Sequence, residues 1–267
     1  MRKSIFFLNL ALLIFILAGL AFLGRHRIVS MWETWLTEPT PEPVSFSEMV
    51  NEQREALNKP LTNDNTNQAV ATPEPEPIPA EFNLAVPFTT QAPHANWDYP
   101  YQEACEEASA LTVHYYYQEQ TFTVDIADRE ILDLVAWEEE VLGFYEDTTA
   151  EETARVMREY WGYQRVDVEY DPTADQIKRH IAAGRPVIIP AAGKQLGNPN
   201  FRNGGPLYHM FVVRGYTADT FITNDVGTRK GENYVYDIDV VMTAMHDWNG
   251  GDVDNGRQAI VVAYPNM

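Results

Sequence analysis

The chain has 267 residues, of which 45% are hydrophobic and 12% aromatic, which is enough for a packed core and excludes a chain that is disordered throughout. The length allows one large domain or two small ones. Its 39 acidic and 19 basic side chains give a formal net charge of -20, which argues against nucleic acid as a partner. The single cysteine excludes an internal disulfide framework and a cysteine-rich zinc module.

Residues 1–27 are predicted to be an N-terminal membrane anchor or signal segment. Arg2 and Lys3 precede the apolar run Ser4–Gly24. As a helix this run spans about 31 Å, which matches a hydrocarbon core of about 30 Å. A cleaved signal peptide usually has a shorter apolar region, but Gly19–Ala21 fits a cleavage site. Both interpretations place the rest of the chain outside the cytoplasm, either anchored to the membrane or secreted.

Residues 28–80 are predicted to be a linker rich in proline and glutamate. Proline and glutamate alternate in Thr72–Pro79, which favours an extended, polyproline-like spacer. A capping box that begins at Ser45 predicts a short helix to about Leu57. The folded domain is therefore expected over residues 81–267.

Helices precede strands in the folded region. Apolar spacing and two capping boxes, at Thr149 and Thr173, predict the helices. Helices are expected over residues 106–118, 126–142, 149–162 and 173–184. Strands are expected over residues 84–89, 187–189, 210–213, 221–223, 234–236 and 259–263. This order favours an α+β fold over a βαβ array.

Cys105 is the only thiol, and it directly precedes a predicted helix. The positive end of the helix dipole and the free N–H groups there favour a thiolate. The adjacent Glu106 and Glu107 oppose it, so a cationic group such as a histidine is needed nearby. The alternative is that Cys105 is a small buried apolar residue.

His209 is the histidine best placed to act as a base, because it follows the loop Asn203–Pro206 and opens an apolar strand. The predicted hairpin brings Asn224 and Asp225 beside it, and either could orient the imidazole. A turn of two or four residues centred at 218–219 puts Asn224 on the same face as His209. A turn of three residues puts Asp225 there. The spacing alone leaves both open.

Four stretches form an ordered series along the chain, and together they resemble a known family. They are Val86–Gln91, Ala104–Ser109, Tyr208–Met210 and Thr223–Gly227. The series resembles the C-thirty-nine-like cysteine peptidases, bacterial relatives of the domain that trims double-glycine leaders from bacteriocins. The resemblance covers about residues 84–265. It implies a papain-like α+β fold, in which the nucleophile begins a helix packed on an antiparallel sheet. The bacteriocin-processing members have glycine after the cysteine, where this chain has Glu106.

The resemblance implies Cys105 as nucleophile, His209 as general base and acid, and Asp225 as the residue that orients His209. A glutamine before the cysteine should help to form the oxyanion hole. Gln91 has the matching motif context, and Gln102 is the alternative. The expected function is hydrolysis of peptide or isopeptide bonds by a membrane-tethered, extracytoplasmic peptidase. The alternatives are a catalytically inactive peptide-binding module and an amide acyltransferase that uses the same triad.

No cofactor or metal is expected. Asp252–Gly256 resembles the start of a calcium loop, but it lacks the final acidic ligand and predicts a turn. The loop Ala191–Pro199 lacks a phosphate-loop signature and is interpreted as a cleft wall or lid. The expected partners are a peptide or protein substrate and, through the N-terminal segment, the membrane. The acidic charge favours cationic or neutral substrates.

Overall fold

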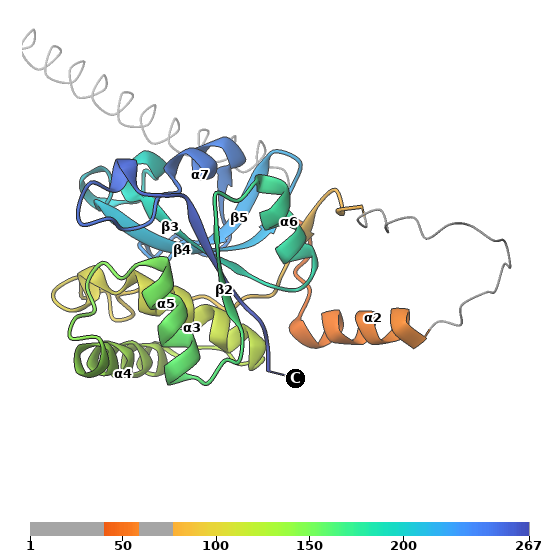
Figure 1. The fold of residues 1–267 in the computed structure, drawn as a ribbon, viewed down its shortest axis with the longest axis horizontal. Helices are drawn as coiled ribbons and strands as arrows, with labels where there is room; N and C mark the ends of the chain where they lie inside the picture. Colours follow the sequence, from red (N-terminus) through yellow and green to blue (C-terminus); the bar gives the residue numbers. More distant parts are fainter. Residues whose placement is uncertain (1–39, 59–76, 267) are drawn as a thin grey trace, which may run out of the picture. The chain divides into compact units, whose positions relative to one another are not determined.

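The computed structural model describes residues 40–58 and 77–266 (Figure 1). The predicted anchor segment, residues 1–27, lies outside these ranges. Within them, every helix is too short or too polar to cross a bilayer.

The helices confirm the sequence prediction, including their start signals. Thr149 and Thr173 each accept a hydrogen bond from the backbone N–H three residues on, in complete capping boxes. The helices they begin end before Gly162 and Gly184, whose φ angles are +73° and +78°. The α-helices are α2 (Phe46–Asn58), α3 (Cys105–Tyr117), α4 (Val124–Val141), α5 (Ala150–Tyr160), α6 (Ala174–Ala182) and α7 (Ile238–Ala244). The 3-10 helices are η1 (Tyr101–Glu103), η2 (Gly193–Leu196), η3 (Arg202–Gly204) and η4 (Val253–Asn255).

The strands form one antiparallel sheet in the order β2-β7-β3-β4-β5-β6, with β1 also paired to β4. They are β1 (Phe82–Asn83), β2 (Val166–Tyr170), β3 (Val187–Ala192), β4 (Tyr208–Tyr216), β5 (Thr220–Asn224), β6 (Tyr234–Asp237) and β7 (Ala259–Ala263). The five strands predicted after residue 184 are present. Strand β2 and helix α7 were not predicted. Together, the helices and the antiparallel sheet confirm the predicted α+β class.

The strand expected over residues 84–89 is wrong, because the chain leaves the sheet after the two residues of β1. Pro87 has no amide hydrogen for a strand ladder. The carbonyl groups of Val86 and Pro87 instead accept hydrogen bonds from Asn224 Nδ2, at 3.1 and 3.0 Å. A side chain of β5 therefore fixes this segment beside the sheet.

Helix α3 lies at the centre of the domain. Figure 1 shows α3, α4 and α5 gathered on one side, with β3, β4, β5, α6 and α7 on the other. Every residue of α3 except His114 is buried, so this helix is enclosed on nearly all sides. Because α3 packs against β4 as well as α4 and α5, its N-terminus has a fixed position over the sheet.

Residues 41–49 lie in the predicted linker, but they pack against the domain. The backbone N–H of Val44 donates to the carbonyl of Asn83 at 2.9 Å. The ring of Phe46 contacts that of Tyr117 edge-on, with centroids 5.2 Å apart. The short helix predicted within the linker is present as α2. Backbone pairing and aromatic burial therefore extend the compact unit to residue 41.

Two buried acidic side chains meet between α3 and α4. Burial raises the pKa of Glu107 well above its ordinary value, and the charge and hydrogen bond of Glu138 raise it further. Burial likewise raises the pKa of Glu138 to about 8. Among the described ion pairs, none joins a basic side chain to either carboxyl group. At neutral pH, a proton shared between the two groups avoids placing two charges in the core.

This pair predicts a loss of stability as the pH rises. An unfolded glutamate releases its proton near its ordinary pKa, whereas folded Glu138 keeps it to about pH 8. The folded chain therefore binds more protons across this window, and its free energy of unfolding falls with increasing pH. We expect Glu138→Gln to reduce that fall and to stabilise the protein at pH 8 by at least about 1 kcal/mol. At pH 5 we expect a much smaller gain.

Urea unfolding at the two pH values measures the difference. Glu140→Gln, on the exposed face of the same helix, is the matched control and should retain the wild-type dependence on pH. Equal pH dependence in wild type and Glu138→Gln would contradict a raised pKa at this site.

Candidate active site

Cys105 is the first residue of α3, and its side chain is buried against the sheet. Its sulfur lies 2.9 Å from Glu106 Oε2, to which the thiol donates. The backbone N–H of Met210, on β4, donates to the same sulfur at 3.3 Å. The thiol therefore lies beside the strand that carries His209, as the helix–sheet arrangement predicted. In the described structure, its hydrogen bonds go to Glu106 and Met210 rather than to His209.

The surroundings of Cys105 favour the neutral thiol. Burial raises its pKa well above the ordinary value, and the charge and hydrogen bond of Glu106 raise it further, while the Met210 N–H opposes the shift. Burial and the charge of Glu107 also raise the pKa of Glu106. Burial, together with the acidic neighbours noted in the sequence, therefore opposes the thiolate that a helix start would favour.

His209 and Asp225 form a buried, hydrogen-bonded pair on the opposite side of the site. His209 Nε2 lies 2.9 Å from Asp225 Oδ1, and both side chains are almost fully buried. Burial opposes ionisation of Asp225, but the charge of His209 and hydrogen bonds from His209, Tyr236 and Asn198 outweigh it and lower its pKa. Because a carboxylate only accepts hydrogen bonds, Nε2 carries a hydrogen and Nδ1 is left as the basic nitrogen.

A β-bulge decides which residue of β5 meets His209. Tyr216 pairs with Phe221, and this four-residue turn by itself would place Asn224 on the His209 face. A bulge at Arg214 then shifts the register by one residue, so that Val212 pairs with Asn224. The shift brings Asp225 to the face of His209 and sends Asn224 toward the segment after β1.

Two residues that support Asp225 were not identified from the sequence. Tyr236 OH donates to Asp225 Oδ2 at 2.5 Å, and Asn198 Nδ2 donates to the same oxygen at 3.0 Å. Asn198 lies in the loop interpreted as a cleft wall or lid. Tyr236 lies on β6, next to β5 in the sheet. Because these contacts span 11 and 27 residues, no local motif marks them.

Gly227 leaves room for the His209 ring. Its N–H donates to Asp225 Oδ1 at 3.1 Å. A Cβ atom at this position would lie 2.7 Å from His209 Cε1, closer than real contacts allow. Phe201 contacts the same ring edge-on. The imidazole is thus held by packing as well as by its hydrogen bond.

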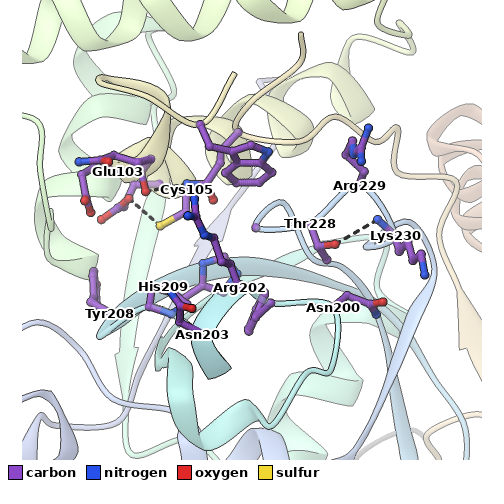
Figure 2. A pocket seen from close by; sticks show the side chains of 18 of the residues that line it. Glu103, Cys105, Asn200, Arg202, Asn203, Tyr208, His209, Thr228, Arg229 and Lys230 are labelled. Carbon is purple, nitrogen blue, oxygen red and sulfur yellow. Dashed lines mark hydrogen bonds between the residues drawn. The ribbon is translucent and has the colours of Figure 1, made fainter. Parts of the chain in front are cut away.

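Cys105 and His209 open onto one cleft of about 750 Å³ (Figure 2). Its lining comes from five regions: the residues before and at the start of α3, the loop between α4 and α5, the loops before β4, the first two residues of β4, and the loop after β5. The lining residues are Gln91, Trp97, Gln102, Glu103, Cys105, Glu106, Asp147, Pro199, Asn200, Phe201, Arg202, Asn203, Gly205, Pro206, Tyr208, His209, Gly227, Thr228, Arg229 and Lys230. The cleft brings together three of the four predicted catalytic residues, Gln91, Cys105 and His209, while Asp225 lies buried behind His209.

Both glutamine candidates for the oxyanion hole line the cleft. The side-chain amide of Gln91 is buried and donates to the carbonyl groups of Tyr101 and Gln102, at 2.9 and 3.0 Å. These bonds account for its two amide hydrogens, so it must exchange one of them to bind an oxyanion. Gln102 is exposed. The backbone N–H of Cys105 is among those that a helix start leaves without an intrahelical acceptor.

Metal ligands do not cluster in the described part of the chain, where no group of three or more His, Cys, Asp or Glu side chains is arranged to hold an ion. The calcium-loop-like segment, residues 252–256, includes the short helix η4 and turns as predicted.

The sequence of this chain matches a known family. The sequence profile of the Peptidase_C39 like family matches residues 83–250, well over half of the chain. The chain belongs to this family. A crystal structure from Bacillus anthracis, described as a C39-like peptidase, is 14% identical, with a TM-score of 0.46, and the match covers 68% of this chain and 96% of that one. No curated protein matches the chain.

Membership of the C39-like family confirms the resemblance found in the sequence, and the α+β arrangement is the papain-like fold that it implied. The matched residues 83–250 include all of the predicted catalytic residues: Gln91, Cys105, His209 and Asp225.

The contact between Glu106 and Cys105 predicts how the thiol of this C39-like chain titrates. Glu106→Gln removes the carboxyl charge that raises the thiol pKa. We expect the pH midpoint for alkylation of Cys105 to be lower in this variant, and the rate at neutral pH to be higher. Iodoacetamide reaction rates across the pH range measure both.

Glu103→Gln is the matched control for this experiment. Glu103 lines the same cleft but is not among the main causes of the thiol shift, so its variant should titrate close to wild type. An unchanged or higher midpoint in Glu106→Gln would show that Glu106 does not control the thiol.

Proposed function

We propose that this chain is a cysteine peptidase that hydrolyses peptide or isopeptide bonds with Cys105, His209 and Asp225. The observation that carries the proposal is the meeting of Cys105 and His209 on one cleft, with His209 fixed from behind by Asp225. The nucleophile begins a helix, while the base and its partner come from a sheet that packs against that helix. This is the spatial arrangement that nucleophilic acyl transfer requires.

In the first step of the proposed reaction, the Cys105 thiol transfers its proton to His209 Nδ1 as the sulfur attacks the carbonyl carbon. His209 then donates this proton to the leaving amine nitrogen as the C–N bond breaks, which leaves an acyl-thioester on Cys105. Asp225 stabilises the imidazolium between the two transfers and keeps Nε2 protonated.

Water completes the cycle. His209 Nδ1 takes a proton from a water molecule, whose oxygen attacks the thioester carbon. The bond to sulfur breaks, the carboxylic acid leaves, and the proton returns to Cys105. The Cys105 backbone N–H and the Gln91 amide, once released from one of its carbonyl partners, stabilise the oxyanion in both halves.

The resting hydrogen bonds require one rearrangement before attack. The thiol donates to Glu106, so it must turn from Glu106 toward His209. Substrate that binds in the cleft brings about this rotation, because the Cys105 side chain forms part of the cleft wall. Catalytic hydrogen bonds commonly tighten only in the complex with substrate.

The same thiol contact favours a second candidate function, a binding module without catalysis. A thiol held neutral by burial and by Glu106 lacks the ion pair of an activated nucleophile. In that function the cleft would bind peptides and release them unchanged. Cleavage experiments with the triad variants separate the two functions.

We also propose that residues 1–27 anchor the peptidase to the membrane, with the domain outside the cytoplasm. The length and apolar character of Ser4–Gly24 support this location. Because the compact unit begins at residue 41, residues 28–40 are the part of the predicted linker that would connect the anchor to the domain.

The triad predicts a graded loss of peptide cleavage. We expect Cys105→Ala to abolish cleavage of a proteome-derived peptide library by the full-length protein. His209→Ala should reduce the rate by at least about 1,000-fold, and Asp225→Asn by at least about 100-fold, because the imidazole then loses its fixed tautomer. Mass spectrometry of the products measures the rates, and an added amine reveals any acyl transfer.

Asp219→Asn, in the exposed turn between β4 and β5, is the matched control and should cleave as wild type. Full activity in Cys105→Ala would contradict the proposed nucleophile. Binding without cleavage by the wild-type protein would instead support the binding module.

A further inference from the structure

Three basic side chains line the cleft, and two of them lie on the side away from its acidic wall. Arg202 belongs to η3, and Arg229 and Lys230 belong to the loop between β5 and β6. Figure 2 shows Arg229 and Lys230 opposite Glu103 and Cys105, with Arg202 between the two groups in this view. The cleft therefore has a basic side and an acidic side.

Among the described residues these cations have no acidic partner, although the chain has 39 acidic and only 19 basic side chains. The ion pairs of the described residues involve other basic groups, and none includes Arg202, Arg229 or Lys230. All three are exposed, so their charges are available to a molecule in the cleft. Such a local excess of cations would attract an anionic group despite the overall negative charge.

The loop that carries Arg229 and Lys230 is held rigidly to the catalytic pair. Gly231 O accepts a hydrogen bond from the Asp225 N–H at 2.9 Å, and Gly231 N–H donates to Thr228 O at 3.1 Å. A Cβ atom on Gly231 would collide with Asp225 O, so only glycine permits this approach. The backbone that carries the two cations therefore has a fixed place relative to Asp225, and binding there needs little ordering of backbone.

We propose that Arg202, Arg229 and Lys230 form a subsite that binds a carboxylate of the peptide substrate. The carboxylate belongs either to an acidic side chain near the scissile bond or to the C-terminus of the peptide. Guanidinium groups bind carboxylates in a bidentate manner, and a cleft concentrates the field of its charges. The subsite deepens the proposed function, because it names the substrate class. Binding can also be measured without cleavage.

Binding of amidated peptides to full-length Cys105→Ala tests the subsite. Peptides of one sequence carry Glu or Gln at each position in turn, and fluorescence polarisation measures their affinities. We expect Glu at one position to bind about tenfold more tightly than Gln, with the difference falling as NaCl rises from about 0.05 to about 0.5 M. The Gln peptide with a free C-terminus shows whether a terminal carboxylate serves as well.

Adding Arg229→Gln and Lys230→Gln should abolish the preference for Glu. The matched control removes the same charge away from the cleft, with Lys194→Gln and Arg155→Gln, and should keep the preference. Lys194 is exposed on η2, and Arg155 pairs with Glu159 on α5, outside the lining. If the control variant also loses the preference for Glu, the effect comes from net charge and the subsite is overturned.

The other possible results of the binding experiment also either support or overturn the subsite. Equal affinity for the Glu and Gln peptides and for both forms of the C-terminus, or no binding of any peptide, would overturn the subsite. A preference that survives Arg229→Gln/Lys230→Gln would do so too. If Glu peptides bind selectively but the wild-type protein cleaves none of them, the subsite stands and the proposed peptidase activity fails.

Discussion

The buried carboxylate of Asp225 is the interaction on which the rest of the site depends. It is fully buried and accepts hydrogen bonds from His209, Tyr236, Asn198 and the backbone N–H of Gly227. An unpaired charge at this depth would be strongly destabilising, so the donors must be brought together for the fold to form. They come from β4, β6 and the loops after β3 and β5. The contacts that hold the imidazole in place are therefore the same contacts that pack this corner of the sheet.

The other half of the site has the opposite electrostatic character. Cys105 lies at the start of a helix buried on nearly all sides, with Glu106 in contact with its sulfur and Glu107 paired to Glu138 behind it. Burial together with nearby carboxyl groups favours protonated forms, so protons are retained around the thiol. The basic nitrogen of His209 is on the sheet side of the cleft. The chemistry we propose therefore moves one proton from an acidic, helical side to a sheet side already prepared to stabilise positive charge.

Local signals in the sequence were sufficient for most helices, because capping boxes and terminal glycines act within a few residues of their own position. Thr149 and Thr173 begin helices where predicted for this reason. Strand limits were harder to predict. Residues 84–89 have the composition of a strand, but Pro87 and the side chain of Asn224 place them outside the ladder. Residues 41–49 look like linker, yet pairing with Asn83 and burial of Phe46 attach them to the domain, which composition does not reveal.

The sequence by itself determined the family, the fold class and the candidates Cys105 and His209, because a lone thiol before a helix and a histidine at a strand entrance are local features. It left Asn224 and Asp225 as alternatives. Only the tertiary structure decided between them, because one bulge at Arg214 changes which side chains share a face of the sheet. The structure also decided that the Gln91 amide binds two carbonyl groups and that three cations gather in the cleft of an acidic protein. These depend on contacts between residues distant in the chain, and neither spacing nor net charge specifies which distant groups the fold brings together.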